Sequence, residues 1–148
     1  MKKNLRIILF SILLMGASSH LHAQESYGGA LNLFGSFGEY SVITGSYEIP
    51  LATNWTISPQ ATIPFDFDFI VAGARVDYYF VSILGLNEPW DIWGGVGAGL
   101  VIGLDEAYSG DGIDLILNIG AEYKFNDKLG IILAFGENGA SLGVGIHL

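Results

Sequence analysis

The segment that decides the fold is IDLILNIGAEYKF, residues 113–125. Every odd-numbered position in it carries an aliphatic or aromatic residue, whereas the even-numbered positions carry Asp, Asn, Gly, Glu and Lys, with Ile116 as the one large apolar exception. Side chains alternate between the two faces of a β-strand, so a period of two over this length predicts one long strand with an apolar face and a polar or small face.

The same alternation recurs on both sides of this segment. It is clear at residues 70–80, 92–104, 129–135 and 141–148, with turn residues at 126–127 and 137–139. It weakens towards the N-terminus, where we predict strands at about 27–34, 39–48 and 53–63 and turns at 35–38, 49–52 and 64–68. Eight strands joined by short turns use nearly all of the chain after residue 23, and an even number of strands lets an antiparallel meander close. The sequence therefore predicts an all-β fold, an eight-stranded antiparallel up-and-down barrel.

The first 23 residues have the pattern of a secretory signal peptide. Three basic residues precede an apolar run of about a dozen residues, and a polar stretch then ends in Ala23. The apolar run is shorter than the roughly 20 residues that a membrane-spanning helix needs. We therefore predict a signal peptide at residues 1–23 and an exported barrel domain at residues 24–148 of bacterial origin.

Composition excludes several classes of function. Beyond residue 23 the chain has three basic residues against 15 acidic ones, a formal charge of −12, so it offers no basic patch for nucleic acid. The chain has no cysteine, which excludes disulfides, thiolate nucleophiles and cysteine-based zinc sites. Yet 51% of its residues are hydrophobic and no stretch after residue 23 holds 18 consecutive apolar residues, so the apolarity must be spread over strands.

The distribution of side chains predicts an inside-out barrel that spans a membrane. The continuous apolar parity suits a lipid-facing exterior, while the opposite parity is rich in glycine and charge and suits a narrow interior. Aromatic residues gather where the predicted strands begin and end, as in the interfacial girdles of membrane barrels. One rim comprises Tyr27, Tyr47, Trp55, Tyr78, Phe80, Trp90, Tyr123 and Phe125, and the other Phe34, Phe37, Tyr40, Phe65, Phe67, Phe69, Tyr108 and Phe135.

Three segments resemble the small eight-stranded outer-membrane β-barrels of the OmpA/OmpX type. They are GARVDYYF at 73–80, GAEYKFNDKLG at 120–130 and the terminal GVGIHL at 143–148. The last is similar to the family's C-terminal assembly signal, although it ends in Leu148 and not in an aromatic residue. The resemblance implies a place in the bacterial outer membrane, contact with its lipid and lipopolysaccharide, insertion through the C-terminal strand by the barrel-insertion machinery, and a monomer. It specifies no activity, because the family includes structural proteins, small pores, adhesins and a few enzymes.

We expect no catalytic, cofactor or metal site. The Gly-rich run at 94–103 does not fit G-x-G-x-x-G and is interpreted as lumen packing. His147 is the sole histidine after the signal peptide, and extended strand would keep it about 20 Å from Ser141 on the same face, so we interpret it as an interfacial polar residue. Acidic residues of the predicted outer turns are hard oxygen donors, but they match no EF-hand loop. They are Glu39, Asp66, Asp68, Asp105, Glu106, Asp111 and Glu137.

Charged residues on the inward parity predict a structural ion pair in the lumen. Arg75 and Lys124 share this parity with Asp77, Asp114 and Glu122, and buried charges must be neutralised. We predict that Arg75 reaches across the glycines of the intervening strand to Glu122, or failing that pairs with Asp77. Because the outer turns are too short to build a binding vestibule, a salt-bridge plug is favoured over a substrate site.

Three functions follow from these features. The first is an integral outer-membrane barrel of structural or housekeeping role without catalysis. The second is a narrow pore for small solutes or ions. The third is a soluble exported barrel that binds an apolar ligand.

Overall fold

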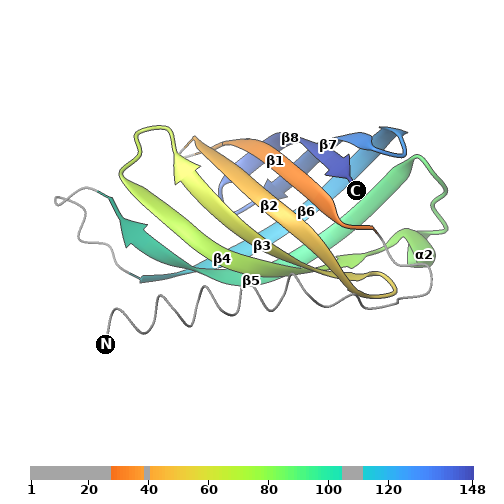
Figure 1. The fold of residues 1–148 in the computed structure, drawn as a ribbon, viewed down its shortest axis with the longest axis horizontal. Helices are drawn as coiled ribbons and strands as arrows, with labels where there is room; N and C mark the ends of the chain where they lie inside the picture. The colour runs from red at the N-terminus through yellow and green to blue at the C-terminus, as the bar shows by residue number, and fades with distance from the viewer. Residues whose placement is uncertain (1–27, 39–40, 105–111) are drawn as a thin grey trace.

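The protein is described by a computed structural model that covers residues 28–38, 41–104 and 112–148. Eight antiparallel strands follow one another around a single barrel, and one short helix, α2, lies between the fourth and fifth (Figure 1). The elements are β1 (Ala30–Phe37), β2 (Val42–Ala52), β3 (Trp55–Pro64), β4 (Phe69–Tyr79), α2 (Val81–Leu84), β5 (Trp90–Gly103), β6 (Gly112–Asn126), β7 (Leu129–Gly136) and β8 (Gly139–His147). The predicted signal peptide, residues 1–23, lies outside the described residues.

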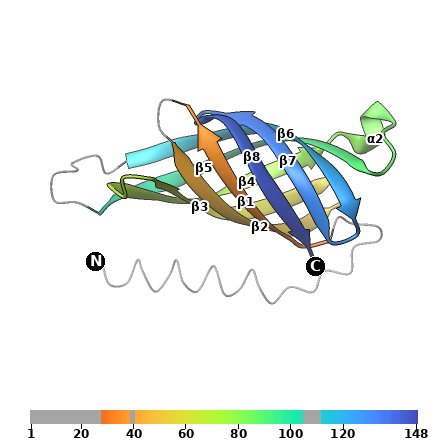
Figure 2. The same cartoon turned by 90° about the horizontal axis from the view of Figure 1, so that it is seen from above.

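The barrel closes through β1 and β8. These strands pair antiparallel from Ala30 opposite His147 to Phe37 opposite Ala140. Each other strand pairs with its neighbour in sequence, so the eight strands form one continuous wall (Figure 2). The prediction of an eight-stranded up-and-down barrel is confirmed. We call the end at which β1 begins and β8 ends the terminal end, and the opposite end the loop end.

Side chains alternate between the interior and the exterior as the sequence pattern indicates. On β8, Leu142, Val144 and Ile146 point outward and are 42–54% exposed, whereas the positions between them are buried. The exterior is therefore aliphatic. The interior combines a small apolar cluster with many hydroxyl and charged side chains, which is the reverse of a soluble barrel.

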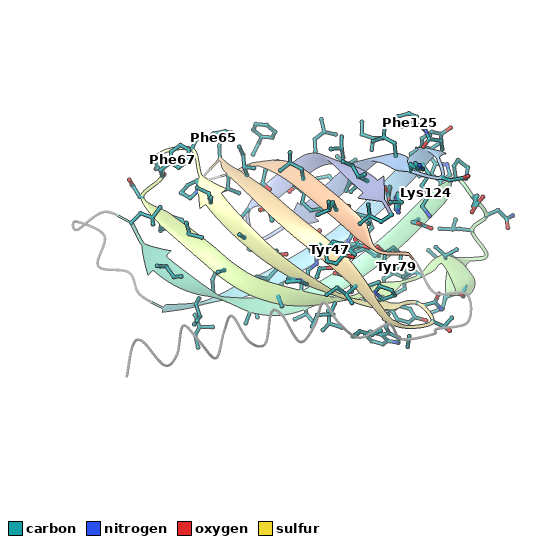
Figure 3. The ribbon with its side chains drawn as sticks, in the orientation of Figure 1. Tyr47, Phe65, Phe67, Tyr79, Lys124 and Phe125 are labelled. Carbon is teal, nitrogen blue, oxygen red and sulfur yellow. The ribbon has the colours of Figure 1, made fainter. Side chains whose placement is uncertain are left out.

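Aromatic side chains mark both ends of the barrel. At the terminal end Trp55 packs edge-to-face on Tyr78 at 4.8 Å, and Trp90 on Tyr123 at 5.0 Å between ring centroids. Figure 3 shows Phe65 and Phe67 at the loop end and Phe125 at the terminal end.

Two residues of the predicted rims belong to the interior, and three cannot be placed. Phe34 is 3% exposed inside the lumen, and Phe69 lines an internal cavity. Both lie on the inward parity of their strands, and this alternation overrides the expectation that an aromatic residue near a strand end faces the membrane interface. Tyr27, Tyr40 and Tyr108 lie outside the described residues.

The first two strands differ from the prediction because residues that commonly form turns lie within them. The sequence predicts Gly35 in a turn, but it pairs with Ile43 on one side and Leu142 on the other as part of β1. The predicted turn at 49–52 is the end of β2, where the pairing with β3 shifts register between Pro50 and Ala52. An irregularity of this kind accommodates a proline, which has no N–H to donate to a ladder.

The strands are unequal in length. β5 and β6 have 14 and 15 residues, whereas β1 and β7 have eight each and β8 has nine. The described residues contain no helix that is long and apolar enough to cross a membrane.

The aliphatic exterior predicts that the stability lost when a charge is placed on it depends on the depth of that charge in the membrane. Leu117 lies near the middle of β6 and Ile113 near its loop end, both facing outward. Leu117→Arg should lower the free energy of unfolding in lipid vesicles by about 2–4 kcal/mol and Ile113→Arg by about 0–1 kcal/mol, since only the former must desolvate in hydrocarbon. Denaturant titration of both variants measures this, and equal losses would contradict a membrane-spanning exterior.

The closing pair of strands can be tested by cross-linking, because the chain has no cysteine of its own. Leu33 and Val144 lie directly opposite each other on the outer face, so the Leu33→Cys/Val144→Cys variant should form a disulfide under oxidation. The Leu33→Cys/Leu117→Cys variant, with cysteines on non-adjacent strands, is the control.

Closure also predicts that the unheated barrel migrates faster than its boiled form on an SDS gel. If neither cysteine variant forms a disulfide and the protein migrates at the same position before and after boiling, the barrel is not closed through β1 and β8.

Candidate functional site

The most buried charges of the described chain form an ion pair on β4. Arg75 and Asp77 are two residues apart, so both side chains point into the lumen, where they are 1% and 0% exposed. Arg75 Nε donates to Asp77 Oδ1 at 2.5 Å and Nη2 to Oδ2 at 3.2 Å. Ser58 on β3 donates to the same Oδ2 at 2.7 Å. Both carboxylate oxygens are thus hydrogen-bonded, as a buried ion pair requires.

Glycines on β5 make room for this pair. Gly95 lies opposite Asp77, and Gly97 lies opposite Arg75. A Cβ on Gly95 would overlap the Asp77 carboxylate and lie 2.8 Å from Arg75 Cδ. A larger residue at Gly95 would therefore displace the pair, whereas a Cβ on Gly97 would overlap the β4 backbone at Ala74. Both glycines are thus needed for close packing at this level of the lumen.

A second set of hydrogen bonds crosses the lumen around Glu48 on β2. Its carboxylate accepts from Asn32 Nδ2 at 2.7 Å and from the Tyr79 hydroxyl at 2.6 Å. These donors come from β1 and β4, so one buried carboxylate joins three strands. The Tyr79 ring also lies 6.1 Å from the Trp93 ring in the small apolar cluster.

Two further ion pairs lie near the terminal end. His147 Nε2 lies 2.9 Å from Glu122 Oε1, and Lys124 Nζ lies 2.7 Å from Asp91 Oδ2. Glu122 on β6 reaches His147 on β8 across β7, because β7 offers only Gly130 at that level. A Cβ on Gly130 would overlap the Glu122 carboxylate.

The residues of these contacts are called the luminal plug. It comprises Asn32, Glu48, Ser58, Arg75, Asp77, Tyr79, Asp91, Glu122, Lys124 and His147.

The structure distributes the predicted charges differently from the first choice of the sequence analysis. Arg75 pairs with Asp77, the second choice, and Glu122 pairs with His147, which was interpreted as an interfacial residue. Asp77 lies on the same face of β4 as Arg75, so it is within reach whatever the register between strands. Glu122 does make an ion pair that spans two strands, but it crosses β7 to His147 and does not cross β5 to Arg75. Asp114 lies towards the loop end, where it lines a cavity.

Six members of the luminal plug were not predicted as part of a luminal ion-pair site: Asn32, Glu48, Ser58, Tyr79, Asp91 and His147. Tyr79 and Asp91 continue the inward parities of β4 and β5, and that signal was available in the sequence. Glu48 and Asn32 lie on the first two strands, where the weak alternation hid their direction.

No catalytic arrangement connects Ser141 with His147. Ser141 Oγ is hydrogen-bonded to Ser36 Oγ at 2.8 Å, and the His147 ring is engaged by Glu122. Across residues 28–38, 41–104 and 112–148, no three His, Asp or Glu side chains gather as a group that could hold a metal ion. Four of the acidic turn residues considered as oxygen donors, Glu39, Asp105, Glu106 and Asp111, lie outside these ranges.

The loop half of the lumen is hollow. A cavity of about 320 Å³ lies between the inner faces of β2 to β6 and the β7–β8 turn. The outer turns were predicted to be too short to build a binding vestibule, and the turn at 105–111 lies outside the described residues. The barrel wall itself forms the cavity, because inward side chains on this half include Thr62, Val71 and Val101, which do not fill the interior.

Comparison of the structure with solved proteins places this geometry in a known fold. The first match is a de novo designed transmembrane β-barrel, with a TM-score of 0.60 at 15% identity over 84% of this chain and 98% of the other. The fold is that of a transmembrane β-barrel. No protein-family model matches the sequence, and no curated protein matches it.

Two natural outer-membrane barrels are also similar in structure. The N-terminal β-barrel domain of Pseudomonas aeruginosa OprF matches with a TM-score of 0.56 at 16% identity, over 84% of this chain and all of that chain. The Yersinia pestis outer membrane protein Ail, determined in a phospholipid bilayer nanodisc, matches with a TM-score of 0.54 at 12% identity, over 82% and 99%. The resemblance to small eight-stranded outer-membrane barrels is thus confirmed at the level of architecture.

The Arg75–Asp77 pair predicts a large effect of removing one partner. Asp77→Asn leaves the Arg75 charge uncompensated in the interior and should lower the free energy of unfolding by about 3–5 kcal/mol. Asp127→Asn, the same change in an exposed turn, should shift it by less than about 0.5 kcal/mol. Denaturant unfolding in lipid vesicles compares the two variants, and equal small shifts would show that the pair is not held away from water.

Proposed function

We propose that this protein is an integral outer-membrane barrel of structural role, with a sealed lumen and no catalytic activity. The observation that supports it most is the luminal plug, in which buried side chains from β1 to β6 and β8 bond one another across the interior. Eight strands leave an interior just wide enough for side chains, and these side chains are fixed by charged hydrogen bonds.

The exterior and the position of the strand ends support a proposal for the location. We propose that the protein comes from a Gram-negative bacterium and is exported by the signal peptide at residues 1–23. The barrel-insertion machinery then recognises β8 and inserts the barrel as a monomer, with its terminal end facing the periplasm. The exposed aliphatic face supports contact with outer-membrane lipid and lipopolysaccharide. A soluble barrel that binds an apolar ligand would bury this face, so detergent-dependent extraction from cells separates the two functions.

Conductance tests the seal. Wild-type protein in planar bilayers should show little or no steady current, and Arg75→Ala should raise the current because it removes the largest buried cationic side chain from the centre of the plug. Lys128→Ala, which removes an exposed turn cation, is the matched control and should leave the current at the wild-type level. Large, stable openings of the wild type that Arg75→Ala leaves unchanged would favour the narrow pore instead.

A further inference from the structure

The cavity in the loop half of the lumen adjoins a much smaller space. This second space, of about 20 Å³, shares Gln60 and Glu137 with the cavity and is also bordered by Arg75 and Asn118. That volume admits a water molecule and little more. A molecule that entered the larger cavity would therefore stop short of the Arg75–Asp77 pair. We call the larger cavity the vestibule.

The vestibule is negatively charged. Asp114 and Glu137 are among the residues that line it, and none of its lining residues in the described part of the chain is Lys, Arg or His. Within the described ranges the basic residues are Arg75, which is paired with Asp77, and Lys124, Lys128 and His147, which lie at the terminal end. Because Arg75 is already paired with Asp77 and the two lysines lie at the far end, the potential in the vestibule favours cationic molecules over anionic ones.

Besides the two carboxylates, the vestibule is lined by the polar side chains of Gln60, Thr62 and Asn138. Gln60 Oε1 is buried without a hydrogen-bond partner, and Gln60 borders both the vestibule and the small space. Asn118, which borders the small space, likewise has a buried Oδ1 without a hydrogen-bond partner.

The remaining wall is apolar. Phe69, Val71 and Val101 line one side of the vestibule. An aromatic and two branched aliphatic side chains give no ligands to a bare metal ion, but they suit the hydrocarbon part of an organic molecule, and Phe69 adds a ring face for a cation. The volume of about 320 Å³ is at the lower end of the range for small-molecule sites.

We propose that the vestibule binds small organic amines in their protonated form. The ammonium group lies near the Asp114 carboxylate, while Glu137 adds negative charge and the hydrocarbon part packs on Phe69, Val71 and Val101. Glu137 is held in place for this role, because its Oε2 accepts from the backbone N–H of Leu117 at 2.7 Å. The proposal depends on the loop half of the lumen and holds whether or not the plug conducts.

Phenethylammonium and its neutral analogue 2-phenylethanol are suitable probes, since they share the same ring and chain. Titrated into the folded barrel in nanodiscs and followed by NMR, phenethylammonium should give saturable shifts at Phe69, Val101 and Asp114. Its dissociation constant should be at least about tenfold lower than that of 2-phenylethanol, as expected from one charge-assisted hydrogen bond.

Two variants separate this site from membrane partitioning. Asp114→Asn should raise the dissociation constant of phenethylammonium about tenfold or more, whereas Asp127→Asn, in an exposed turn at the terminal end, should leave it unchanged. Val101→Phe fills the vestibule without changing its charge and should abolish saturable binding. The heat-dependent mobility in SDS reports that each variant is folded.

Three results would overturn the proposal. The first is equal affinity for the amine and the alcohol. The second is shifts confined to outward residues such as Leu115 and Leu117, which would show partitioning into lipid only. The third is displacement of the amine by Mg²⁺ at equal concentration, which would assign the carboxylates to a metal ion.

Discussion

Hydrocarbon offers no partner for a backbone N–H or C=O, and the pairing of β1 with β8 is what satisfies this constraint in the present chain. Without that seam each of the two strands would expose an unpaired edge to lipid. Once the seam forms, the direction of every other side chain is fixed by parity. The aliphatic residues must face outward, and the charged ones must share an interior that only a few side chains can occupy.

The interior solves two problems with one type of residue. Its charges need partners, and its narrow cross-section leaves little room for long side chains to approach one another. Glycines on the intervening strands provide that room, as Gly130 does beneath Glu122 and Gly95 beside Asp77. The glycine content that would weaken an ordinary strand is here offset by buried ion pairs and hydrogen bonds that join separate strands.

Much of the architecture could be predicted from the sequence because the strongest signal, the period of two, is also the quantity that the membrane constrains. It identified β4 to β8 within a few residues. It failed where Gly35 and Pro50 interrupt the alternation of β1 and β2, since a glycine or a proline inside a paired strand looks locally like a turn.

The site was harder to predict for a different reason. Parity says which side chains enter the lumen, but not which of them meet. Whether Glu122 meets Arg75 or His147 depends on strand stagger and on the side chains between them, and both are set by closure of the whole barrel. The vestibule is likewise a property of the closed wall: no single segment shows that Thr62, Val71 and Val101 together leave space unfilled.

The unequal strand lengths have a consequence for the surrounding bilayer. The wall built from β5 and β6 extends further along the barrel than the wall built from β7, β8 and β1, and its loop end still carries apolar residues such as Ile102 and Ile113 on the outside. A bilayer of uniform thickness cannot match both sides at once. The mismatch must be relieved by a tilt of the barrel or by lipids that stretch on one side and compress on the other. The protein thus imposes a direction within the plane of the membrane, although its fold is a nearly symmetric ring of strands.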